Sequence, residues 1–136
     1  MLSAMIIVFC SLFSFMIFGP RIEALYFPVV SKMTIVSAEQ QGEDVYLMAE
    51  LTKLRPCEYI GVSWYKVDSF GTKNQIRVTS MRDPDDISSP TRPVGRQTIG
   101  PWLFKGLVVE DLQQNIYAEL THRCHPMWLT TTNFWP

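Results

Sequence analysis

The sequence is poor in the residues that metal and nucleophilic sites most often use, and it has no excess of charge of either sign. Its 136 residues contain two histidines and three cysteines, and 12 basic side chains balance 13 acidic ones. Without a basic excess the chain has no footprint for phosphates, so we expect no nucleic-acid partner. At this length we expect one domain at most, and no fixed-period repeat divides it.

Charged side chains are absent from residues 1–20, and the first charge in the chain is Arg21. Within this stretch the apolar run 2–18 is at the lower edge of the roughly 17–25 residues that span a bilayer. A buried core helix is another interpretation, but its uniform apolarity disfavours it. We predict a signal peptide or membrane anchor over residues 1–24 and an extracytoplasmic domain over residues 25–136, with residues 2–18 in the membrane if the segment is uncleaved.

The choice between cleavage and retention depends on the residues around Ala24. Cleavage after Ala24 would place Ile22 at the −3 position, with Pro20 breaking the helix upstream. Arg21 and Glu23 are unfavourable in the last part of a signal peptide, and a basic N-terminal region is missing. The pattern predicts export, and it favours a retained anchor over secretion after cleavage near Ala24.

Cysteine usage also points to an oxidising compartment. Cys10 lies in the apolar run, which leaves Cys57 and Cys124 as a pair in the domain. A disulfide between them closes a loop of about 68 residues, which the chain-entropy model values at roughly 4 kcal/mol. We predict this disulfide and expect it to clamp opposite parts of the domain. In a reducing cytosol both cysteines would instead be small buried thiols.

After residue 25 the pattern is period two, rich in β-branched and aromatic residues and interrupted by turn residues. In the segment 45–54, for example, one face carries Val45, Leu47, Ala49 and Leu51. The predicted strands cover residues 32–36, 45–54, 58–68, 75–81, 101–110 and 115–124. In the last of them the alternation directs Cys124 toward the interior. We expect no amphipathic helix after residue 25.

Short strands separated by turns predict an all-β fold, an antiparallel β-sandwich of immunoglobulin-like architecture preceded by an N-terminal apolar helix. A small open β-barrel is the alternative. Membership of the immunoglobulin family is not indicated, because Trp64 follows Cys57 by only seven positions and no tyrosine stands two residues before Cys124.

The stretch THRCHPMWL, residues 121–129, holds both histidines and one cysteine. His122, Cys124 and His125 are therefore the natural metal ligands, but in a strand the first two point one way and the third points the other. Cys57 would have to join them in a four-ligand zinc site. The crowding of Cys, His and Met excludes a blue-copper site. A metal-binding or redox protein using these three residues is the alternative hypothesis, and we expect no cofactor.

No nucleophile motif such as G-x-S-x-G occurs, so we expect no enzymatic activity. A hydrolase that uses the aspartates of a polar loop is a third hypothesis. This loop, residues 82–97, is longer than most connections and is the predicted binding site. Its charged residues are Arg82, Asp83, Asp85, Asp86, Arg92 and Arg96. A solvated, variable connection is the other interpretation.

The C-terminal residues 127–136, MWLTTTNFWP, are unusually aromatic. Two interpretations of Trp128, Phe134 and Trp135 stand side by side. They belong to a last strand that docks on the sheet, or they form an exposed patch that faces a partner or the bilayer interface.

Three motifs carry a resemblance to known proteins: LRPC (54–57), RPVGRQTIGPW (92–102) and HRCHPMW (122–128). The chain resembles small proteins encoded in tailed-phage and prophage genomes, with an apolar N-terminus followed by a short β-rich domain. The similarity covers most of the chain, from the apolar segment through Trp128. It implies a setting in the envelope of a bacterium that carries the phage and a pairing of Cys57 with Cys124, and it assigns no catalytic residue.

These features together predict a non-enzymatic, envelope-associated or secreted β-sandwich that acts as an interaction module. We expect a disulfide between Cys57 and Cys124 to stabilise it. Its expected partners are the membrane, through residues 2–18, and a protein of the cell envelope or virion.

Thiol titration in denaturant tests the disulfide. We expect two more reactive thiols per chain after reduction than before, because Cys57 and Cys124 are joined and Cys10 is not. Equal counts before and after reduction, with thiols that react only once a chelator is added, would support the metal hypothesis instead.

Overall fold

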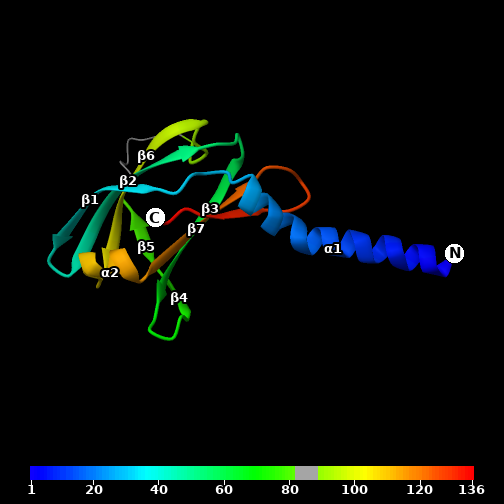
Figure 1. The fold of residues 1–136 in the computed structure, drawn as a ribbon. Helices are drawn as coiled ribbons and strands as arrows, with labels where there is room; N and C mark the ends of the chain where they lie inside the picture. Colours follow the sequence, from blue (N-terminus) through cyan, green and yellow to red (C-terminus); the bar gives the residue numbers. More distant parts are fainter. Residues whose placement is uncertain (82–88) are drawn as a thin grey trace.

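The structure, a computed structural model, describes residues 1–81 and 89–136. Its elements in chain order are α1 (Leu2–Tyr26), β1 (Thr34–Gln41), β2 (Asp44–Lys53), β3 (Glu58–Val67), β4 (Lys73–Ile76), β5 (Val78–Ser80), β6 (Gly95–Lys105), α2 (Val109–Gln114), β7 (Ile116–Arg123) and β8 (Thr130–Asn133). The strands form one β-sandwich, and α1 projects away from it (Figure 1).

The predicted antiparallel β-sandwich is confirmed. The described strands form two four-stranded sheets, in the orders β1-β2-β6-β5 and β4-β3-β7-β8. Neighbouring strands in each sheet run antiparallel. Because the described strands form two separate sheets and not one continuous sheet, the alternative of a small open β-barrel is not what they form.

The interior is lined by the strand faces that the sequence alternation predicts. Val45, Leu47 and Ala49 of β2 are completely buried, because the period of two directs every second side chain inward. On β7 the same rule buries Leu120 and His122. The apolar faces of the two sheets therefore meet in a single core.

An aromatic cluster fills the centre of this core. Trp64 of β3 is 3% exposed. Four other rings pack edge-on around it with centroids 4.7–5.8 Å away, and they belong to Trp102, Phe104, Phe134 and Trp135. Such edge-to-face pairs are favourable beyond their buried area.

The C-terminal aromatic residues are thus largely internal, which corrects one interpretation of the sequence. Phe134 is 0% and Trp135 is 7% exposed, so the two do not form an exposed patch. The backbone explains their position, because Phe134 N–H donates to Ala118 O and Phe134 O accepts from Met33 N–H. These bonds extend the docking of β8 on β7 to the tail that follows it.

The segment 75–81, predicted as one strand, is two strands in different sheets. β4 pairs with β3, placing Ile76 opposite Trp64, whereas β5 pairs with β6, placing Val78 opposite Phe104. The chain crosses from one sheet to the other at Arg77, a change that an alternating pattern alone does not reveal.

Two other boundaries differ from the prediction. β6 begins at Gly95, six residues before the predicted start of that strand, and the expected turn at residues 111–115 is largely the short helix α2. In the first turn of α2, Val108 N–H donates to the Asp111 carboxylate at 3.3 Å. This bond satisfies one of the amides that a helix start leaves without a partner.

Helix α1 does not end at Pro20 but continues through it to Tyr26. Proline removes one intrahelical hydrogen bond, and contacts with the sandwich hold the turn that follows. Arg55, for example, donates to the carbonyl of Phe27 at 2.9 Å. Residues 2–18 are exposed, and α1 is long and apolar enough to cross a membrane, a test that a signal sequence also passes.

Replacing Trp64 tests the central role of the aromatic cluster. We expect Trp64→Ala to lower the free energy of unfolding by about 3–5 kcal/mol, because it leaves a cavity among four aromatic neighbours. Denaturant unfolding of the full chain in micelles, followed by near-UV circular dichroism, measures this. Phe70→Ala is the matched control, since Phe70 is 92% exposed. An equal loss in the two variants would contradict the assignment.

Candidate functional site

The predicted disulfide is present and joins Cys57 to Cys124, with their Cα atoms 4.5 Å apart. Cys57 directly precedes β3 and Cys124 directly follows β7, and the adjacent residues Glu58 and Arg123 are paired in the ladder. The disulfide therefore links neighbouring strands of one sheet. The expectation that it clamps opposite parts of the domain is wrong.

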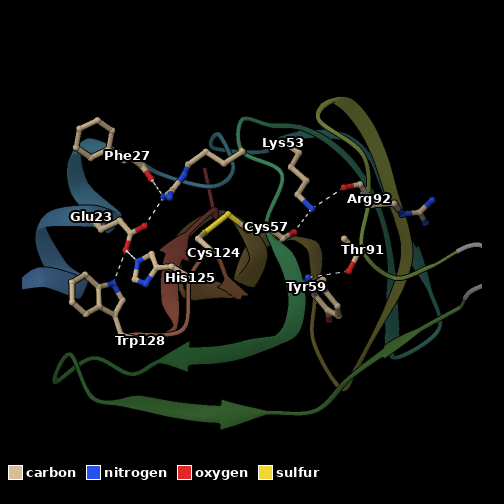
Figure 2. Close-up of a disulfide and its surroundings, with 11 residues drawn as sticks. Glu23, Phe27, Lys53, Cys57, Tyr59, Thr91, Arg92, Cys124, His125 and Trp128 are labelled. Atoms are coloured by element: carbon tan, nitrogen blue, oxygen red, sulfur yellow. Dashed lines mark hydrogen bonds and ion pairs between the residues drawn. A yellow bond between two sulfur atoms is a disulfide. The ribbon is translucent and has the colours of Figure 1, made fainter. Parts of the chain in front are cut away.

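A buried carboxylate lies on one side of this disulfide (Figure 2). Glu23, in the last turns of α1, is 8% exposed. Its Oε1 accepts from Arg55 at 2.8 Å, and its Oε2 lies 2.9 Å from Nε2 of His125 and 2.5 Å from Nε1 of Trp128. An ionised carboxylate only accepts hydrogen bonds, so the facing nitrogen of His125 is the donor. All three donors belong to the sandwich, whereas the acceptor belongs to the helix.

These bonds keep Glu23 ionised despite its burial. Burial raises the pKa of the Glu23 carboxyl, but the hydrogen bonds from His125, Trp128 and Arg55 outweigh this and lower its pKa to about 2. Charge-assisted hydrogen bonds to a desolvated carboxylate are among the stronger polar contacts in proteins. The helix end is thus fastened to the sandwich by charge as well as by packing.

The packing beside Glu23 is close. The indole of Trp128 lies edge-on to Phe15 and to the ring of His125, with centroids 5.1 and 4.8 Å away. It also covers Gly19, where an added Cβ would come within 2.5 Å of the indole carbon Cη2. Only glycine allows this approach of helix and tryptophan without displacement. Of the three C-terminal aromatic residues, Trp128 is therefore the one that packs on Phe15 and Gly19 of the helix.

A buried lysine lies on the other side of the disulfide (Figure 2). Lys53 is 3% exposed, and its Nζ donates to the carbonyls of Cys57 at 2.6 Å and Arg92 at 2.7 Å. Nearby, the backbone N–H of Tyr59 donates to the Thr91 hydroxyl at 3.1 Å. Burial lowers the pKa of the Lys53 ammonium group. Among the described residues, no carboxylate forms an ion pair with Lys53.

His122 lines the same cavity as this lysine and is close enough to be affected by its charge. It is 3% exposed and packs edge-on against Tyr59, with centroids 6.1 Å apart. Burial, and secondarily the positive charge of Lys53, lower the pKa of His122 to about 4. The ring is therefore neutral at neutral pH, and its buried Nδ1 has no hydrogen-bond partner in the described part of the protein.

Lys53 and His122 both line a cavity of about 770 Å³ between the two sheets. Its walls are largely apolar, and β2, β6, β3 and β7 all contribute to them. The apolar wall residues on these strands are Leu51, Ile99, Trp102, Val62 and Leu120. This volume is within the roughly 300–1,000 Å³ of small-molecule sites.

The structure does not bring His122, Cys124 and His125 together as metal ligands. Cys124 is bonded to Cys57, His122 faces the cavity and His125 contacts Glu23. Over residues 1–81 and 89–136, no group of three metal-ligating side chains is close enough to hold an ion.

The predicted binding loop is only partly described. Arg82, Asp83, Asp85 and Asp86 lie outside the described residues. Arg92 precedes β6, and its carbonyl holds Lys53 as given above. Arg96 is not in a loop but in β6, where its guanidinium pairs with the Glu50 carboxylate of β2.

Sequence reasoning missed the residues that matter most here, which are Glu23, Arg55, Lys53 and Tyr59. One signal was available for Glu23, because an acidic residue after an apolar run requires a partner if it folds against the domain. For Lys53 the signal was the alternation of side chains in its strand, which directs this residue inward.

No protein-family model matches this chain, and no curated protein or solved structure is significantly similar to it. What the protein does is therefore argued from the geometry of the site.

The pH dependence of stability separates the two sides of the disulfide. An unfolded histidine has a pKa of about 6.5, and His122 in the folded protein has one of about 4. Its contribution to stability is therefore complete above pH 6.5 and is lost as the pH falls toward 4, by about 3 kcal/mol. Glu23 acts in a lower window, because its contribution is lost only from about pH 4.5 toward 2.

Denaturant unfolding of the full chain between pH 7 and 4 measures this loss. We expect His122→Asn to be nearly flat over that interval, since asparagine does not titrate. A variant profile as steep as that of the unchanged protein would show that another group is responsible.

Proposed function

We propose that this protein is an exported, non-enzymatic interaction module, held at a membrane surface by a retained α1, with its sandwich on the oxidising side. One observation carries the proposal. Three donors of the sandwich, Arg55, His125 and Trp128, converge on Glu23 of the helix. Cleavage near Ala24 would remove this acceptor and leave the donors unpaired at a partly buried site.

The energetics of these contacts favour retention of the helix over its cleavage. A buried polar group that loses its partner costs about 1–3 kcal/mol, and more if it is charged. Arg55 would lose the Glu23 carboxylate, and the Phe27 carbonyl that it also binds would be left near a free chain end. The fold of the sandwich is thus adapted to a helix that stays attached.

We further propose that the sandwich is immunoglobulin-like. If β1 to β8 are taken as strands A, B, C, C′, D, E, F and G, the two sheets have the orders ABED and C′CFG, which supports this. The buried Trp64 on β3 also corresponds to the tryptophan expected on strand C. The disulfide differs, because it links the ends of C and F instead of strands B and F.

An envelope setting agrees with these features. A disulfide persists in oxidising compartments, and immunoglobulin-like domains commonly serve as surfaces for protein contacts. The resemblance to phage-encoded proteins suggests a partner in a bacterial envelope or in a virion. Superinfection exclusion, assistance in lysis and a virion surface role all fit this setting.

N-terminal sequencing of the chain recovered from membranes tests the tether. We expect the N-terminus to lie upstream of Glu23, and the chain to remain in the membrane after alkaline carbonate washing. Cross-linking in the intact envelope, followed by purification of the full chain, is expected to recover a protein partner.

An N-terminus after Ala24 would overturn the tether. Glu23→Gln and Glu43→Gln form a matched pair, since both remove one carboxylate but Glu43 is exposed. Only Glu23→Gln is expected to increase protease cleavage between helix and sandwich, because only it weakens the bonds described above.

A further inference from the structure

The cavity between the sheets has polar side chains at one end, and these take no part in the contacts between the helix and the sandwich. Lys53 has three N–H donors, and two of them bind the carbonyls of Cys57 and Arg92. Within residues 1–81 and 89–136 the third has no acceptor, which leaves it available to a ligand. A buried ammonium group without a counter-ion is costly, and the described residues supply no carboxylate within ion-pair distance.

A second unused polar group lies at the same end. The neutral ring of His122 is 3% exposed and lines the cavity, and its Nδ1 has no partner in the part of the chain that the structure describes. Tyr59 packs against this ring and also lines the cavity. Native proteins rarely leave buried polar groups unsatisfied without a functional reason. One anionic group between Lys53 and His122 would satisfy both side chains.

The remainder of the cavity is suited to hydrocarbon. Its apolar wall is contributed by both sheets, from Leu51 and Ile99 on one side to Val62 and Leu120 on the other. The strand amides around it are largely paired within the two ladders. A bound peptide would bury amides that find few partners there, whereas an alkyl chain has no such groups.

We propose that this cavity binds a single-chain amphiphile with an anionic head group, the chain lying between the sheets and the head contacting Lys53 and His122. The shared chemistry is a carboxylate or phosphate on a long alkyl chain, such as a fatty acid or a lysophospholipid. The binding site goes beyond the tether proposed above, and only the source of the ligand rests on it.

The position of the cavity agrees with a ligand from the bilayer. Val30 lines the cavity and stands four residues after the end of α1 at Tyr26. The same short connector is fixed to the end of β2, because Ser31 N–H donates to Thr52 O at 2.9 Å and Leu54, the second residue after Thr52, donates its N–H to Val29 O at 2.7 Å. The cavity therefore lies at the end of the sandwich that α1 enters.

Equilibrium binding of radiolabelled myristate tests the proposal, with the full chain in phosphatidylcholine nanodiscs and empty nanodiscs as the partition control. We expect saturable binding of one myristate per chain above the control. Monomyristoylglycerol, which has the same chain without charge, is expected to compete at least tenfold more weakly. A lysophosphatidate of the same length, used as a competitor, distinguishes the phosphate head from the carboxylate head.

Two substitutions locate the site. Lys53→Met is expected to weaken myristate binding at least tenfold, whereas Lys53→Arg retains most of it. Because Lys53 also supports the fold, Ile99→Trp offers an independent test, filling the cavity without changing its charge. Thr98→Trp is its control, since Thr98 is the exposed neighbour on the opposite face of β6. Near-UV circular dichroism establishes that each variant is folded.

Binding no greater than in empty nanodiscs would overturn the proposal. Equal affinity for the charged and uncharged ligands would do so as well, as would full binding by folded Ile99→Trp. The tether is tested separately, by the position of the N-terminus and by carbonate washing. An anchored chain that binds nothing overturns the cavity proposal alone, and a cleaved chain that binds myristate overturns the tether alone.

Discussion

The covalent bond between Cys57 and Cys124 is the constraint on which both sides of the site depend. Arg55 stands two residues before Cys57, and His125 stands directly after Cys124, so the bond holds together two donors that Glu23 needs. Without it, these donors would be connected only through the ends of β3 and β7. The same bond fixes the carbonyl of Cys57, which accepts a hydrogen bond from Lys53 on the cavity side.

The helix and the sandwich therefore form a single unit and are not joined by a flexible linker. In a flexible tether we would expect polar, exposed residues between the apolar segment and the first strand. Here the connector is short and apolar, and Val29 and Val30 are buried. The orientation of the sandwich relative to the helix is set by contacts, and at a membrane this fixes which end of the domain faces the lipid.

Much of the fold could be predicted from the sequence, because it follows from the alternation of apolar and polar residues in the strands and from the presence of two cysteines in the domain. The inward faces of β2 and β7 and the disulfide were all available in this way. The crossing at Arg77 was not, since both halves of the segment have the same period. The partners of Glu23 were not either, because they lie up to 105 residues away in the sequence. The alternation of the last predicted strand placed His122 inside, and that of residues 45–54 would have placed Lys53 there too, but only the packed sheets reveal the cavity between them.

The attachment of α1 also determines how tension would travel through the molecule. A pull on the helix passes along the backbone to β1, and in parallel through Glu23 to Arg55 and His125, which flank the two disulfide-bonded cysteines. The load would enter β3 and β7 at both ends of a covalent link, which does not rupture at the forces that peel hydrogen-bonded strands apart. The contact of Glu23 with its donors would yield first, because it is the non-covalent part of this path, and the load would then pass to β1 alone.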